Sequence, residues 1–68
     1  MDFNRFIKRL FNGIVGTMTI QEIARYLGVD DGTVYRWQNC QAKPSGQAMV
    51  MLVALYEAKT GQSVKSIM

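Results

Sequence analysis

The side chains of this chain that could do chemistry offer hydrogen bonds and positive charge rather than catalysis. The 68 residues include no histidine and a single cysteine, Cys40. That thiol has no imidazole to act as its base, and zinc ligands of the Cys/His type are missing. No glycine-rich phosphate-binding motif is present either. We therefore expect no enzyme activity, no metal and no cofactor.

Three side chains able to hold an anionic or polar partner lie between residues 31 and 43. The guanidinium of Arg36 could donate two parallel hydrogen bonds to a guanine edge, or remain a solvated surface group. Lys43 could bind a phosphate or lie free in a loop, and Tyr35 could face DNA or pack inside the protein. The net charge of +3 is compatible with a nucleic-acid partner but is ordinary for a small domain.

Helical elements must position these groups. Apolar residues recur at helical spacing over 2–12, and Gly13 is expected to end that helix. Ser45 is expected to cap a last helix over 45–59, which Gly61 closes. The tail, 60–68, is too short for a prediction, although Val64 and Ile67 could pack back onto the domain.

A capping box predicts the start of a helix over 19–27. Thr19 and Glu22 have the spacing at which each side chain accepts a hydrogen bond from the other residue's backbone N–H. Gly28 then supplies the positive φ that turns the chain sharply. Ala24 is small enough to let a second helix approach closely.

Asp30 predicts the cap of that second helix, over 30–39, with Val34 and Trp37 facing inward. Two short capped helices joined by a tight glycine turn satisfy the geometry of a helix-turn-helix. The sequence thus predicts one all-α domain over 1–68, a compact bundle of four to five helices containing this unit.

The segment Gly28 to Asn39, GVDDGTVYRWQN, followed by KPS at Lys43 to Ser45, resembles the phage-repressor-like (Cro/Xre) helix-turn-helix family. The resemblance covers about Phe3 to Tyr56. It implies a lambda-repressor-like fold and a dimeric transcription regulator, of a kind often encoded by phages or mobile elements. The expected partner is double-stranded operator DNA, with no small-molecule ligand.

The resemblance also implies site residues. The positions that read bases in the family correspond to Asp31, Gly32 and Arg36. Those that touch phosphate or flanking bases correspond to Thr33, Tyr35, Asn39 and Lys43, and to Thr19 and Gln21 at the start of the preceding helix. Because glycine has no side chain and phosphates repel a carboxylate, direct readout is expected to depend mainly on Arg36.

The last predicted helix is apolar on nearly every side. One face can cover the helix-turn-helix, and a monomer of this size has no second layer for the other face. We therefore expect a two-fold dimer that sets two recognition helices about 34 Å apart on a palindromic site. The expected interface residues are Val50, Met51, Ala54, Leu55 and Ala58.

The expected cellular location follows from the segments that the sequence lacks. No apolar run approaches the roughly 18 residues that span a membrane, and the first residues do not resemble a signal peptide. A cytoplasmic, nucleoid-associated repressor is the main hypothesis. Two alternatives remain: a protein-interaction module, such as an antitoxin-like or polymerase-binding factor, and an architectural or excision factor.

Overall fold

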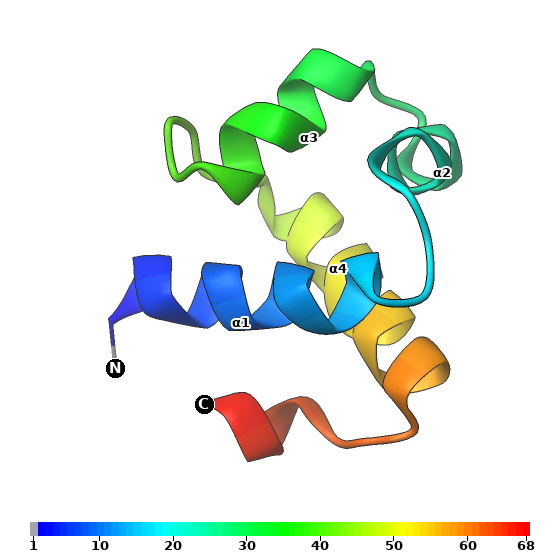
Figure 1. Cartoon of the computed structure of the whole chain (residues 1–68). Coiled ribbons are helices and arrows are strands. Elements are labelled where there is room, and N and C mark those ends of the chain that lie inside the picture. The colour runs from blue at the N-terminus through cyan, green and yellow to red at the C-terminus, as the bar shows by residue number, and fades with distance from the viewer. Residues whose placement is uncertain (1) are drawn as a thin grey trace.

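The computed structural model describes residues 2–68; Met1, which the predicted domain includes, lies outside the described residues. Four α-helices follow one another and a short 3-10 helix ends the chain (Figure 1). The elements are α1 (Phe3–Val15), α2 (Ile20–Leu27), α3 (Asp31–Gln38), α4 (Gly46–Thr60) and η1 (Val64–Ile67). The prediction of an all-α helical bundle is confirmed.

The first helix lies at the centre of the bundle. It packs against α4, α3 and η1, and its buried apolar face contacts all three elements. The radius of gyration is 10.8 Å, close to the roughly 11 Å expected for a folded chain of this length. The buried residues of α1 are Phe6, Ile7, Leu10, Phe11 and Ile14.

Side-chain caps start the helices where the sequence predicts them. The Thr19 hydroxyl accepts from the N–H of Glu22, and the Glu22 carboxylate accepts from the N–H of Thr19. Asp30 and Ser45 cap α3 and α4 in the same way, by accepting from the N–H three residues later. These caps satisfy N–H groups that have no partner within the first helical turn.

The predicted end of α1 at Gly13 is wrong, because the helix continues to Val15. Gly13 lies where α1 crosses α4. A Cβ atom at this position would lie 2.4 Å from Cε2 of the Tyr56 ring. The glycine therefore permits close approach of two helices instead of supplying a turn.

The fourth helix faces the core on one side and solvent on the other. Ala48, Leu52 and Tyr56 are buried as expected. The prediction that Leu55 belongs to an outer face is wrong. Its side chain is only 6% exposed, because it lies one turn after Leu52 on the core-facing side of α4.

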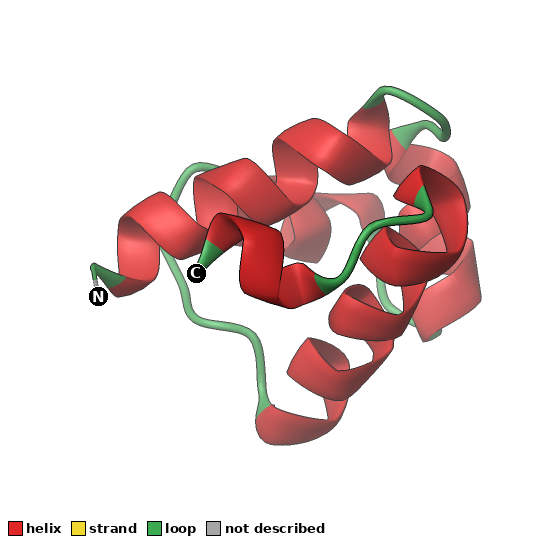
Figure 2. Ribbon diagram, turned by 90° about the horizontal axis from the view of Figure 1, so that it is seen from below, coloured by secondary structure: helices red, strands yellow, loops and turns green. Residues whose placement is uncertain are grey.

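The C-terminal segment folds back onto the bundle, as Figure 2 shows from below, where η1 lies beside α1. The backbone N–H of Val64 donates to the Glu57 carboxylate of α4 at 2.9 Å. Val64 and Ile67 are partly buried against the core, so the tail packs back onto the domain. Among residues 2–68, no helix combines the length and the apolar character needed to cross a membrane.

Helices α2 and α3 form a pair joined by three residues. Figure 1 shows α2 nearly end-on and α3 across the view, so the two cross steeply. Gly28 has a φ of 74°, in the left-handed region, as predicted. Ala24 and Val34 are fully buried between the pair and the core. The tight turn and the small contact residue thus produce the steep crossing.

Candidate functional site

The outer face of α3 carries most of the predicted site residues. Val34 and Trp37 are buried and fix the rotation of the helix against the core. Tyr35 is 46% exposed and Arg36 is exposed as well. Since residues three and four apart lie on the same side of a helix, two adjacent stripes form the solvent face. Their members are Asp31, Tyr35 and Asn39 in one stripe and Gly32 and Arg36 in the other.

A chain of hydrogen bonds holds the first two turns of α3 together. Nη2 of Arg36 donates to the hydroxyl oxygen of Thr33 at 3.1 Å. That hydroxyl donates in turn to the Asp30 carboxylate, which also accepts from the backbone N–H of Thr33 at 3.3 Å. The guanidinium of Arg36 therefore points back along its own helix toward the N-terminus.

The charge of Asp30 is stabilised by this arrangement. The hydrogen bond from the Thr33 side chain is the main cause that lowers the pKa of Asp30, and the positive charge of Arg36 acts in the same direction. Asp31 is exposed in the first turn. A carboxylate at a helix N-terminus interacts favourably with the exposed N–H groups there.

Gly32 leaves room for the guanidinium. A Cβ atom at this position would lie 3.5 Å from Nη1 of Arg36, which is ordinary contact, and 3.1 Å from Oδ2 of Asp30, which is tight. An alanine methyl group would therefore fit beside the guanidinium, and the Asp30 carboxylate would have to shift by a few tenths of an ångström.

The start of α2 offers a second set of exposed groups. Thr19 and Gln21 are both exposed, as the prediction of a surface role requires. The Thr19 hydroxyl is already an acceptor for the Glu22 N–H. The backbone N–H of Thr19 is the main cause that lowers the pKa of Glu22, followed by the Thr19 hydroxyl and by the charges of Lys59 and Arg25.

Lys43 lies in the loop between α3 and α4. Its ammonium is 5.5 Å from the centre of the Phe3 ring, at the first residue of α1. A cation over an aromatic face is attracted by the negative charge of the ring's π face. The structure therefore places Asp31, Gly32, Tyr35 and Arg36 on the outer face of α3 and Lys43 beside the start of α1. The sequence gives no sign of this contact between residues forty positions apart.

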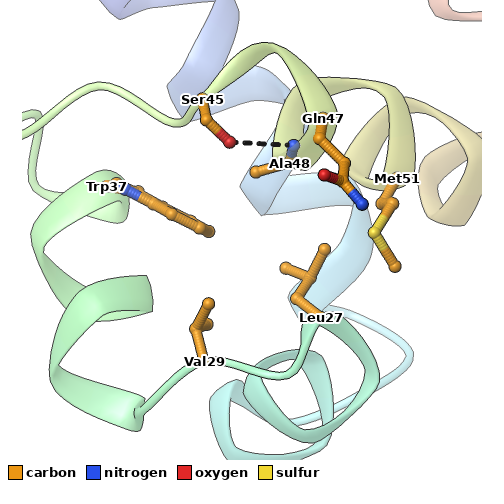
Figure 3. Close-up of a pocket in the computed structure, with 7 residues that line it drawn as sticks. All are labelled: Leu27, Val29, Trp37, Ser45, Gln47, Ala48 and Met51. Carbon is orange, nitrogen blue, oxygen red and sulfur yellow. Dashed lines mark hydrogen bonds between the residues drawn. The ribbon is translucent and has the colours of Figure 1, made fainter.

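A shallow groove of about 220 Å³ opens between the α2–α3 turn and the start of α4 (Figure 3). Its lining is mostly apolar and contains no titratable group, so it offers nothing for acid–base or nucleophilic chemistry. Pockets that bind small molecules are usually larger, about 300–1,000 Å³. The lining residues are Leu27, Val29, Trp37, Ser45, Gln47, Ala48 and Met51.

In the part of the chain that the structure describes, no three His, Cys, Asp or Glu side chains are grouped so that they could hold a metal ion. The chain matches no protein-family model, no curated protein and no solved structure.

The chain of hydrogen bonds from Arg36 through Thr33 to Asp30 was not predicted from the sequence. The spacing of three between these residues could have indicated it, because residues three apart are neighbours on a helix.

Proposed function

We propose that this protein is a sequence-specific DNA-binding transcription regulator of the repressor type. One observation carries the proposal: α3, the second of two steeply crossing helices, buries Val34 and Trp37 and exposes Tyr35 and Arg36. An exposed helix face of this kind fits the major groove of B-DNA, where base edges differ in their donors and acceptors. The resemblance to Cro/Xre repressors supports the same function.

In this mechanism α3 enters the groove and Arg36 donates to a guanine, while Tyr35 packs against a thymine methyl or a sugar. At the start of α2, the backbone N–H groups of Ile20 and Gln21, which take no part in the capping box, bind a phosphate. A dimer on a palindromic operator blocks polymerase by occupancy, in a cytoplasmic, nucleoid-associated setting. The phage or mobile-element character of this repressor rests on the sequence resemblance alone.

The acidic residues at the start of α3 are the main objection to DNA binding. The hydroxyl and the N–H of Thr33 donate to Asp30 and lower its pKa, and the charge of Arg36 adds to this effect, so the charge of Asp30 is partly compensated within the protein. Asp31 remains exposed. There it could accept from a cytosine amino group or stabilise the helix N-terminus. The arrangement is therefore compatible with a DNA-facing α3.

The test is fluorescence anisotropy with random and promoter-derived duplexes at two salt concentrations. Arg36→Ala is expected to lower discrimination between selected and random DNA by about 5- to 150-fold, the value of one bidentate contact. Lys43→Ala is expected to weaken binding to all duplexes alike and to reduce the salt slope by about 1.

Lys65→Ala is the matched control, because it removes the same charge from η1, an element outside the proposed reading face. It is expected to change neither selectivity nor the ranking of duplexes. Circular dichroism checks that each variant is folded. Unchanged DNA binding in both the Arg36 and Lys43 variants contradicts the proposed reading face.

A protein-interaction module is the second candidate, and one surface favours it. Tyr26 on α2 is 53% exposed and lines a shallow depression with Met18, Glu22 and Arg25. Tyrosine is enriched in protein interfaces because it combines a large apolar ring with a polar hydroxyl. Failure to bind any duplex at low salt, with the fold intact, favours this candidate over DNA binding.

A further inference from the structure

We propose that Thr33 is a positioning residue whose hydroxyl sets the direction of the Arg36 guanidinium and so determines base selectivity. This inference rests on the proposed DNA-binding function. It gives Thr33 a role different from the phosphate contact that the family resemblance implies for this position. The role follows from the direction of the hydrogen bonds around the hydroxyl.

A threonine hydroxyl has a single proton to donate, whereas its oxygen can accept two hydrogen bonds. Here the proton is donated to the Asp30 carboxylate. The oxygen is left to accept, and it accepts from Nη2 of Arg36 at 3.1 Å. With its proton committed to Asp30, the hydroxyl has none to donate to a DNA phosphate.

The same bonds orient Arg36 without using up its donors. A guanidinium has five N–H groups in one rigid plane, and one of them is directed at Thr33. Arg36 is exposed, so its other donors remain accessible from solvent. Fixing the plane before binding removes part of the entropy that a free arginine loses when it docks.

Two neighbours support this geometry. Asp30 is the N-cap of α3, so the helix start fixes its carboxylate at the end of the chain of hydrogen bonds. Gly32 leaves open the space beside Nη1 of Arg36. The N-cap, the hydroxyl and the guanidinium are thus held in one line along α3.

The experiment compares Thr33→Val and Thr33→Ser. Valine keeps the branched shape and lacks the hydroxyl, whereas serine keeps the hydroxyl. The wild-type protein first selects binding sequences from a duplex library with a randomised central segment. Anisotropy then gives the affinity of each variant for the best selected duplex and for versions with single G-to-A changes.

We expect Thr33→Val to reduce discrimination at the guanine read by Arg36 about two- to tenfold, with non-specific binding and salt slope unchanged. Thr33→Ser is expected to restore wild-type discrimination. Thr33→Ala, which also lacks the hydroxyl, replaces the valine variant if circular dichroism shows that valine disturbs the fold. The Arg36→Ala protein identifies the guanine concerned.

Three results overturn the inference: unchanged discrimination in the hydroxyl-free variant, an equal loss in the serine variant, or a uniform loss on all duplexes with a shallower salt slope. The last result would instead assign Thr33 to a phosphate. Failure of the proposed function is recognised separately, because the wild-type protein would then select no sequence from the library.

Discussion

Cys40 follows the last residues of α3 and adopts a φ of 61°. Its N–H donates to the Trp37 carbonyl, and the N–H of Gln41 donates to the Arg36 carbonyl at 2.8 Å. This pair of bonds is the Schellman motif, in which the left-handed position is usually glycine. Gly28 occupies that position at the end of α2. At α3 a residue with a Cβ atom takes the same conformation at some cost in stability.

Replacing Cys40 with glycine is expected to stabilise the protein. Removing the Cβ atom from a left-handed residue should raise the free energy of unfolding by about 1 kcal/mol. For a domain of this size that corresponds to a rise of about 4–8 °C in Tm. Thermal unfolding followed by circular dichroism measures the change. Gly28→Ala is the reciprocal variant and is expected to lower Tm; a lower Tm for Cys40→Gly would contradict this account.

At the level of elements, the crossing of α1 and α4 depends on one missing side chain. Tyr56 is buried over Gly13, so its ring has little space into which to move. Gly46 is also helical, at the first position of α4, but a Cβ atom there would meet nothing within 4 Å. Both glycines are therefore helical, but only Gly13 has a neighbouring side chain in the place that a Cβ atom would occupy.

Alanine at these two positions is expected to have opposite effects. Gly13→Ala should destabilise the protein by about 1–3 kcal/mol, because the added methyl group overpacks the contact with Tyr56. Gly46→Ala should raise stability by about 0.5–1 kcal/mol, because alanine loses less backbone entropy in a helix. Urea denaturation of both variants gives the two values. Equal effects at the two positions would show that helix propensity, and not the crossing, decides the outcome.

For the molecule as a whole, the outer side of α4 remains without a partner in the monomer. Val50 is 70% exposed, and Ala54 and Ala58 are also exposed one and two turns later. Met51 is partly buried beside the groove next to α3. Small side chains at a spacing of four permit close approach of a second helix. We propose that a second copy of the chain covers this row, with Leu55 excluded from the interface.

A charge placed on that row is expected to separate the copies. Sedimentation should find the wild-type protein as a dimer at tens of micromolar and Val50→Lys as a folded monomer, because a buried lysine without a partner is costly. Gln62→Lys adds the same charge to the exposed turn after α4 and should leave the dimer intact. A monomeric wild-type protein at that concentration would sink the dimer proposal.

The features that the sequence alone determined are those that depend on neighbours in the chain. The caps at Thr19, Asp30 and Ser45 are bonds between residues three apart, and the turn at Gly28 needs only a local φ. The burial of Val34 and Trp37 follows from helical periodicity. Element type, helix starts and the exposed face of α3 could therefore be predicted.

Contacts between distant residues were decided by the tertiary structure. Gly13 reads as a helix end in the sequence, since nothing local reveals that Tyr56 will lie over it. Leu55 was assigned to the wrong side of α4 because that helix is apolar almost all round. Its hydrophobic periodicity therefore does not show which face is buried. The contact of Lys43 with Phe3 likewise depends on how the helices pack. These contacts depend on how the helices cross, and a local sequence pattern does not determine the crossings.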